Sequence, residues 1–238
     1  MVQNHLSRIA APKTWHVNRK LTKWVARPMP GAHPLDKSLT LSFILRDILS
    51  HCKTKKEVNK ILNDGNLFVD KKIRKENKFA VGLMDVVELP KLNETYRILF
   101  NNKGELSLVS INKTEANLKL LKIVRKNAVK NSKIQITFHD GKNLLMDKFE
   151  GRVGDTALFD LTKNSVTKWI TLDKGVIVYL SGGKHIGNIC KIKDVIRVKN
   201  LEKPKVVVEI EGTEYTTLME YAFVVGEKHP ELSLGDKK

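Results

Sequence analysis

The chain has 238 residues, with 43 Lys and Arg against 26 Asp and Glu, which gives a formal net charge of +17 at pH 7. This excess of positive charge predicts a polyanionic partner such as a nucleic acid. Hydrophobic residues make up 41% of the chain, which is enough for modest cores in one to three small domains and excludes extensive disorder.

Three features bear on where the chain works. Its longest run without a charged residue, residues 175–183, is about half of the roughly 20 residues that a transmembrane helix needs. The N-terminus has no apolar stretch typical of a secretory signal, so we expect a cytoplasmic protein. Cys52 and Cys190 lie far apart in the chain, which predicts buried free thiols and argues against a disulfide or a thiolate metal site.

Residues 1–37 are predicted to form a basic N-terminal extension. The first 35 residues contain no acid, and their basic residues are interleaved with Trp and Pro. Composition alone fits a disordered, solvated tail. It equally fits a segment that orders on RNA, in which cations neutralise phosphates and Trp stacks on bases, and the two tryptophans favour this second interpretation. The candidate RNA-binding residues of this segment are Arg8, Lys13, Trp15, Arg19, Lys20, Lys23, Trp24 and Arg27.

Two helices are predicted at the start of the next segment, residues 38–92. Apolar residues at helical spacing indicate an amphipathic helix over residues 38–49. Arg46, on its polar side, is a further candidate RNA-binding residue. Thr54 and Glu57 have the spacing of a capping box, which indicates the start of a second helix that ends at the glycine after it.

Basic residues concentrate on the second helix and on the turn that follows it. Lys56 and Lys60 lie four positions apart on one helix face, so they repel each other unless phosphates or solvent absorb their charge. A basic turn over residues 70–75 follows, between short predicted strands. A merely solvated face is one interpretation. An RNA-binding surface is the other, because the helix face and the turn concentrate positive potential on one side.

This segment resembles the alpha-L RNA-binding motif, two helices against a small sheet, over the run TKKEVNKILNDGNLFVDKKIRKENKFAVGLMDVVEL. The opening HLSRIAAPKTW and the later ARPMPGAHPLDKSLTL are similar to one family that contains this motif. That family is small-subunit ribosomal protein four of the archaeal and eukaryotic (e) type. The resemblance covers nearly the whole chain, including the order of its segments.

The resemblance implies a structural constituent of the small ribosomal subunit that binds and stabilises ribosomal RNA in the cytoplasm. Its implied partners are small-subunit ribosomal RNA and neighbouring ribosomal proteins, with no cofactor, metal, membrane or small-molecule substrate. It also implies that the second helix and the basic turn contact ribosomal RNA through Lys55, Lys56, Lys60, Lys71, Lys72 and Arg74.

Residues 93–172 are predicted to form a central β domain. Alternating apolar residues around Asp140-Gly141 indicate a hairpin over residues 134–146, and a similar pattern precedes it over residues 96–111. Periodicity alone leaves residues 118–129 open between a helix and a buried strand, and the family resemblance favours the strand.

Residues 173–226 resemble a KOW motif, two strands joined by a Gly-containing turn inside an SH3-like β-barrel. Gly183 and Gly187 match the spacing of that motif. The departures from its usual Thr-Gly-Gly-x-Asn-x-Gly-Arg-x-Gly pattern are at Ser181, His185, Asn188 and Cys190. The candidate RNA-binding residues here are Lys184, His185, Gly187, Lys191 and Arg197. The final residues, 227–238, are predicted to form a frayed tail.

Enzymatic functions find no local support in the sequence. The phosphate-loop, zinc-helix and Gly-x-Ser-x-Gly patterns are absent. One rival function is an RNA-modifying enzyme of the pseudouridine synthase type, because the alpha-L motif also precedes such domains, but their catalytic Arg-Leu-Asp does not occur. A second rival is a free RNA-binding regulator. The sequence thus predicts a multi-domain α+β protein, not an enzyme, with an alpha-L domain, a central β domain and an SH3-like barrel.

Overall fold

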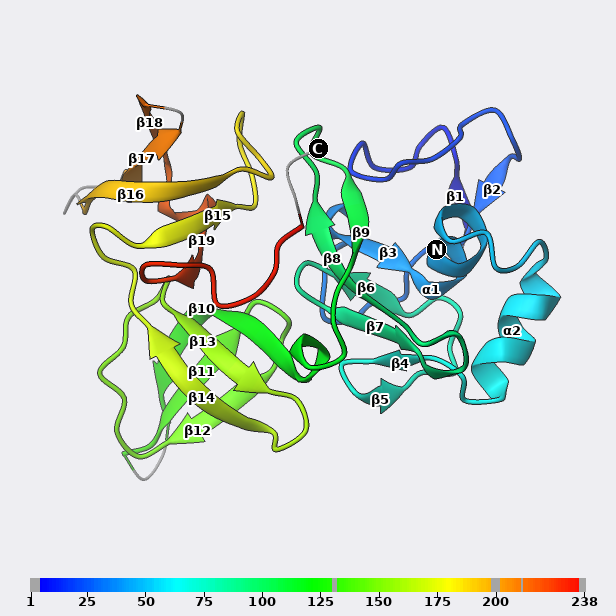
Figure 1. Cartoon of the computed structure of the whole chain (residues 1–238), viewed down its shortest axis with the longest axis horizontal. Coiled ribbons are helices and arrows are strands. Elements are labelled where there is room, and N and C mark those ends of the chain that lie inside the picture. The colour runs from blue at the N-terminus through cyan, green and yellow to red at the C-terminus, as the bar shows by residue number, and fades with distance from the viewer. Residues whose placement is uncertain (1–4, 130–131, 198–201, 211, 236–238) are drawn as a thin grey trace. The chain divides into compact units, whose positions relative to one another are not determined.

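The computed structural model describes residues 5–129, 132–197, 202–210 and 212–235. β-strands dominate it, and the few helical segments are short (Figure 1). The chain divides into two compact units. Unit 1 is Met1–Leu99 with Glu105–Asn117, and unit 2 is Phe100–Gly104 with Leu118–Lys238. The multi-part, β-rich architecture expected from the sequence is confirmed, with less helix than an α+β class implies.

Among the residues that the structure describes, unit 1 contains three small antiparallel sheets and all of the α-helix. Its sheets have the strand orders β1-β2, β3-β6 and β5-β4-β7-β8-β9. Its strands are β1 (Leu6–Ser7), β2 (Trp24–Val25), β3 (Ser38–Thr40), β4 (Phe68–Val69), β5 (Lys72–Ile73), β6 (Ala80–Gly82), β7 (Val86–Leu89), β8 (Glu94–Phe100, whose last residue is grouped with unit 2) and β9 (Leu106–Ser110). Its helical segments are η1 (Leu35–Lys37), α1 (Leu41–Phe43), η2 (Ile44–Ile48), α2 (Lys55–Asn63), η3 (Pro90–Leu92) and η4 (Glu115–Asn117).

The first predicted helix begins three residues later than expected. Residues 38–40 form β3, which pairs antiparallel with β6. Thr40 then starts α1, because its side chain accepts a hydrogen bond from the backbone N–H of Phe43 at 3.2 Å. The segment continues as the π-helical turns of η2. Residues 38–45 are all buried, so their apolar pattern could not separate a buried strand from a buried helix.

The second helix, α2, has the predicted capping box. The Thr54 hydroxyl accepts from the backbone N–H of Glu57 at 3.4 Å. The Glu57 carboxylate accepts in return from the backbone N–H groups of Lys53 and Thr54, at 2.8 and 3.4 Å. These bonds satisfy amide groups that the first turn of a helix leaves without partners, and they fix where α2 begins.

The N-terminal segment is packed into unit 1. Trp15 is 2% exposed, and its ring lies 5.1 Å from the ring of Phe43. Arg8 is 1% exposed and forms an ion pair with Asp47 at 2.5 Å. Residues 5–37 therefore have internal partners, which corrects the expectation of a tail that is disordered or orders only on RNA.

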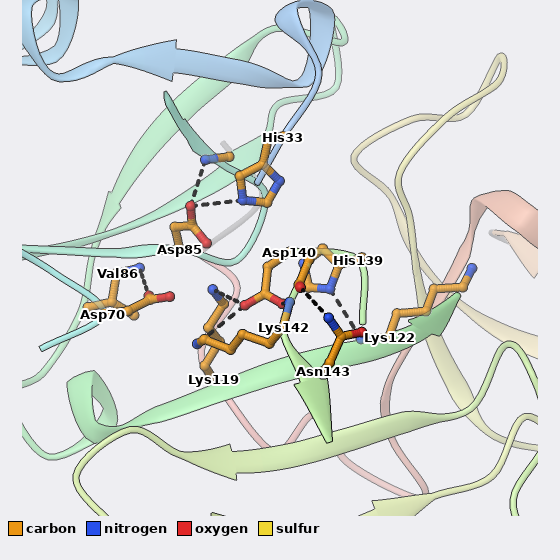
Figure 2. A network of polar contacts seen from close by, with 12 residues as sticks. His33, Asp70, Asp85, Val86, Lys119, Lys122, His139, Asp140, Lys142 and Asn143 are labelled. Carbon is orange, nitrogen blue, oxygen red and sulfur yellow. Dashed lines mark hydrogen bonds and ion pairs between the residues drawn. The ribbon is translucent and has the colours of Figure 1, made fainter. Parts of the chain in front are cut away.

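A buried polar contact fastens the later part of this segment. Nε2 of His33 lies 3.0 Å from Oδ2 of Asp85 (Figure 2). The same carboxylate oxygen accepts from the backbone N–H of Gly82 at 2.8 Å. The proline-rich stretch, residues 28–34, is therefore held at β6.

Unit 2 is built from two five-stranded antiparallel sheets. Their strand orders are β12-β11-β10-β13-β14 and β18-β17-β16-β15-β19. The strands of the first sheet are β10 (Leu118–Ala128), β11 (Ile134–Phe138), β12 (Asn143–Met146), β13 (Thr156–Asp160) and β14 (Ser165–Ile170). Those of the second are β15 (Ile177–Leu180), β16 (Ile189–Ile196), β17 (Lys205–Ile210), β18 (Thr213–Leu218) and β19 (Ala222–Gly226), with the 3-10 turn η5 (Met219–Tyr221) before β19. The predicted hairpin over residues 134–146 and the strand at 118–129 are confirmed.

Two buried lysines of β10 tie unit 2 together, and Figure 2 shows the ion pair that one of them, Lys119, makes with Asp140. Nζ of Lys119 lies 3.1 Å from the carboxylate of Asp140. Nζ of Lys122 donates to three carbonyl oxygens, two in η5 at 3.2 and 2.8 Å and that of Ala222 at 2.5 Å. The charge of each ammonium group is thus met by oxygen atoms inside the protein, as burial requires.

The C-terminal residues that the structure describes are partly packed. Leu232 is 2% exposed, and the backbone N–H of Glu231 donates to the carbonyl of Val225 at 3.0 Å. Burial of a leucine at this point corrects the expectation of a frayed tail for residues 227–235, and residues 236–238 lie outside the described part. Cys52 and Cys190 are buried and free, as predicted.

The expected domain boundaries do not all coincide with the edges of the sheets. The boundary after residue 92 falls within the sheet β5-β4-β7-β8-β9. The boundaries after residues 37, 92, 172 and 226 stay predictions about which parts fold on their own.

Candidate RNA-binding surface

Helix α2 presents a basic face to solvent. Its apolar positions, Val58 and Leu62, are buried, whereas Lys55, Lys56 and Lys60 are exposed. In the part of the chain that the structure describes, no ion pair joins these three lysines to an acid. Their charges are therefore available to a polyanion.

A hollow of about 1170 Å³ in unit 1 connects this helix with the N-terminal segment. Arg27 and Lys55 both line it, so the fold brings together two predicted residues that are far apart in the sequence. The proline-rich stretch forms much of its wall, and Lys78 adds a further cation. Lys78 was not predicted, although it continues the basic run that begins at residue 71.

The basic turn is a tight hairpin between β4 and β5. Asp70 and Lys71 have φ angles of 49° and 62°, and the Asp70 carboxylate accepts from the backbone N–H of Val86 at 3.1 Å (Figure 2). The hairpin is therefore anchored to the start of β7, and its backbone conformation is that of a two-residue turn with positive φ at both positions.

The three predicted cations of this hairpin have different surroundings. Nζ of Lys71 pairs with the Glu88 carboxylate at 2.8 Å. The guanidinium of Arg74 lies over the ring of Phe79 at 4.4 Å. Lys72 is exposed. Lys72 is thus the residue of this group best placed to meet a phosphate.

The N-terminal candidates divide between the interior and the surface. Arg8 and Trp15 are interior residues, buried against Asp47 and Phe43, and their contact with RNA stays a prediction. Arg19 is exposed but donates to carbonyl oxygens of residues 8, 9 and 11, which holds the chain around it. Arg46 pairs with Asp47 at 2.7 Å.

Trp24 is the exposed aromatic residue of this region. It is 47% exposed, its ring centroid lies 4.8 Å from that of His5, and Nζ of Lys23 lies 5.0 Å from it. Lys13 and Lys20 are exposed as well. An exposed indole beside cations is the arrangement that stacks on unpaired bases.

The candidates of unit 2 lie around the turn before β16 and along that strand. Lys184, Lys191 and Arg197 are exposed. The His185 ring is packed at 4.2 Å on that of Tyr215, an aromatic partner that the sequence analysis did not identify. Unit 2 thus has exposed cations and one pair of packed aromatic rings among its candidates.

Gly187 has a structural reason for its identity. Its φ is +83°, and a Cβ atom there would lie 2.6 Å from the carbonyl oxygen of Asn101. Both residues belong to unit 2, so this glycine is required by the packing of the chain on itself. Close approach of RNA is not needed to explain it.

The described residues form neither a metal site nor a membrane-spanning helix. Among them, no group of three or more His, Cys, Asp or Glu side chains could hold a metal ion. Within residues 5–129, 132–197, 202–210 and 212–235, no helix has the length and apolarity to cross a membrane.

Comparison with known proteins identifies the family of the chain. Residues 92–166 match the Ribosomal family S4e, and residues 2–36 match the RS4NT (NUC023) domain. The small ribosomal subunit protein eS4 of Methanocaldococcus jannaschii is 38% identical over 241 residues, which cover 98% of each chain. That of Methanocella arvoryzae is 35% identical over 230 residues and 97% of each chain.

A solved structure of a related protein has a similar fold. The crystal structure of the 30S ribosomal protein S4e from Thermoplasma acidophilum superposes with a TM-score of 0.71 at 30% sequence identity, and the match covers 84% of this chain and all of that one. Since the sequence similarity extends over almost the full length of the relatives, the chain belongs to the S4e family of small ribosomal subunit proteins.

Proposed function

We propose that the chain is a structural constituent of the small ribosomal subunit, where it binds and stabilises small-subunit ribosomal RNA. The observation that carries this proposal is the 38% identity over 98% of the chain with a protein named small ribosomal subunit protein eS4. The protein then works on the ribosome, in the cytoplasm, and its partners are ribosomal RNA and neighbouring ribosomal proteins. It is a structural protein and not an enzyme.

The charge distribution supports this function. A net charge of +17 favours a polyanion. The lysines of α2, the hollow that contains Arg27 and Lys78, and the exposed Lys72 form the proposed RNA-binding surface of unit 1. In unit 2, the proposed contacts are Lys184, His185, Lys191 and Arg197. Contacts of this kind position a protein on RNA through its phosphates.

We also infer the module types. The capped helix α2, the helical segment before it and the tight basic hairpin support an alpha-L module in unit 1. The sheet β18-β17-β16-β15-β19 supports an SH3-like module with a KOW motif in unit 2. Three basic parts on one chain, counting the N-terminal segment, would let it bridge several RNA helices.

Sedimentation of a cell lysate tests the proposal. The protein should migrate with the small subunit at low salt and stay with it through a high-salt wash. A free RNA-binding regulator or an RNA-modifying enzyme would be found near the top of the gradient after the wash, and that result would exclude a structural role.

The salt dependence of binding gives a second measurement. On purified small-subunit RNA, a site that neutralises about ten phosphates should give a log–log slope of roughly −7 to −9, because each phosphate on a duplex contributes about −0.9 and each on a single strand less. A slope shallower than about −3 would contradict a footprint that uses several modules.

A further inference from the structure

Unit 2 contains a second hollow, of about 610 Å³, which none of the predicted contacts except Arg197 touches. Phe149 and Trp169 form its aromatic wall, with their ring centroids 4.6 Å apart. Both rings are half-buried and pack with one side on the core of the sheet β12-β11-β10-β13-β14. The wall is therefore attached to the rigid part of unit 2 and still lines an open hollow.

The loop that carries Phe149 is held in place by the protein itself. Nζ of Lys126 donates to the carbonyl oxygens of Phe149 and Gly151 at 2.8 and 3.1 Å, and it lies 5.2 Å from the centroid of the Phe149 ring. A Cβ atom on Gly151 would lie 2.2 Å from Cζ of that ring, so any larger residue there would displace the ring. An aromatic wall fixed in advance binds a ligand without first losing conformational freedom.

The opposite side of the loop is also fixed. The buried carboxylate of Asp155 accepts from the backbone N–H of Arg152 at 2.7 Å and from that of Leu172 at 2.9 Å. Asp155 is thus engaged with the backbone of the loop. The exposed charged residues that line the hollow are Lys148, Glu150, Arg152, Asp173 and Arg197. Together with the buried Asp155, the lining holds three cations and three carboxylates, so its charge is balanced. The cations Lys148, Arg152 and Arg197 can meet the anionic groups of a ligand whose aromatic body packs on the two rings.

We propose that this hollow binds one unstacked nucleobase of single-stranded RNA. The base packs against Phe149 and Trp169, and Arg152 and Arg197 meet the phosphates on either side of it. Aromatic stacking holds bases of any sequence, and basic residues beside the rings follow the backbone. The inference rests on the proposed function, and it adds the kind of RNA feature that unit 2 recognises, a base outside a helix.

Tryptophan fluorescence of the full-length protein tests the inference. The chain has three tryptophans; Trp15 is buried, and Trp24→Phe removes the exposed one of unit 1. In that background, a change in fluorescence on adding ligand reports Trp169. The probes are the RNA tetranucleotide of adenosine and an abasic ribose-phosphate oligomer of the same length and charge. We expect the tetranucleotide to quench the fluorescence and to bind about tenfold more tightly than the abasic oligomer.

Two variants separate stacking from charge. Phe149→Leu should weaken binding of the tetranucleotide about tenfold and leave binding of the abasic oligomer unchanged. Arg152→Gln with Arg197→Gln should weaken both probes, because it removes phosphate contacts. Lys133→Gln with Lys163→Gln removes the same number of exposed charges elsewhere in unit 2 and is the matched control. The arginine pair is exposed, so its test holds even where Phe149→Leu lowers the thermal stability.

Two outcomes would overturn the inference. In the first, the abasic oligomer binds as tightly as the tetranucleotide, which would mean that only charge attracts RNA here. In the second, N-acetylphenylalaninamide changes the Trp169 fluorescence and the tetranucleotide does not, which would assign the hollow to an apolar side chain of a neighbouring protein. Either result leaves the sedimentation test of the proposed function unaffected, so failure of the inference and failure of the function remain distinct.

Discussion

Two basic regions of unit 1 use their charges in opposite ways. In residues 5–37, Arg8 is buried against Asp47 and Arg19 binds backbone carbonyls, so part of the charge holds the protein together. On α2, Lys55, Lys56 and Lys60 face solvent. Both regions look alike in composition. The oxygen atoms that the fold places near a cationic side chain therefore decide its role. A cation with such partners stabilises the protein, and one without them stays available for binding.

The largest predicted effect on stability is at the two tryptophans of the N-terminal segment, one buried and one exposed. Trp15→Ala should lower the free energy of unfolding by about 3–5 kcal/mol, because it empties a buried site next to Phe43. Trp24→Ala, at an exposed position, should change it by less than about 0.5 kcal/mol. Urea unfolding measures both. Equal, small effects would mean that the segment is a tail after all.

The buried ion pair should give the next largest effect. Arg8→Met removes the buried partner of the Asp47 carboxylate and leaves the pair with Arg46, and we expect a loss of about 3 kcal/mol in the free energy of unfolding. Lys56→Met on α2 is the matched substitution, and it should leave stability nearly unchanged. If both variants unfold at the same urea concentration, the contrast between the two regions is wrong.

Binding should respond in the reverse order. Replacing Lys55, Lys56 and Lys60 by Gln removes three exposed charges, so affinity for small-subunit RNA should fall at least tenfold, about 1.4 kcal/mol, and the salt slope should become shallower by roughly 2 to 3. Thermal stability should hold or rise slightly, since Lys56 and Lys60 no longer repel each other.

A charge-matched control distinguishes this surface from general attraction. Its substitutions, also to Gln, are at the exposed residues Lys91, Lys103 and Lys163. An equal loss of affinity in both triple variants would remove the face of α2 from the binding site.

The helix cap gives a smaller effect. Thr54→Ala removes the side chain that accepts from the backbone of Glu57, and it should cost about 1 kcal/mol of unfolding free energy. RNA affinity should fall only as far as the basic face becomes less ordered. Unchanged stability in urea would show that α2 does not depend on its cap.

The smallest effect is a dependence on pH. The backbone N–H of Lys53, followed by the hydroxyl and N–H of Thr54, lowers the pKa of the Glu57 carboxyl below its ordinary value of 4.5. The folded state therefore holds this proton less tightly than the unfolded state. The resulting stability is present above the ordinary pKa and is lost as pH falls through the lowered pKa. In Glu57→Gln, the free energy of unfolding should depend less on pH below pH 4.5 than it does in the parent protein. Urea unfolding at several pH values measures both.

Local patterns predicted much of the fold. The hairpin of β11 and β12 followed from alternation around Asp140-Gly141, and the start of α2 followed from its capping box. Residues 38–40 were misassigned because their strand partner, β6, lies far along the chain and every residue of the stretch is buried. Periodicity reports local geometry, whereas pairing across the chain is a tertiary contact.

The candidate site was less predictable for the same reason. Exposed lysines of α2 followed from helical spacing, but the burial of Arg8 depends on Asp47, which is distant in sequence. The aromatic wall of Phe149 and Trp169 likewise joins a loop to a strand end, and no local pattern signals that meeting.

The bond from Lys122 to Ala222 has a consequence for the order of folding during synthesis. Its partners are 100 positions apart, and β19, which begins at Ala222, pairs with β15 to complete the second sheet of unit 2. Loops of that length close slowly, because their entropy is lost before their contacts form. Unit 1 ends at residue 117 and has all its strands while the rest of the chain is still being made. Unit 2 therefore cannot complete its second sheet until β19 has left the ribosome that is translating the chain.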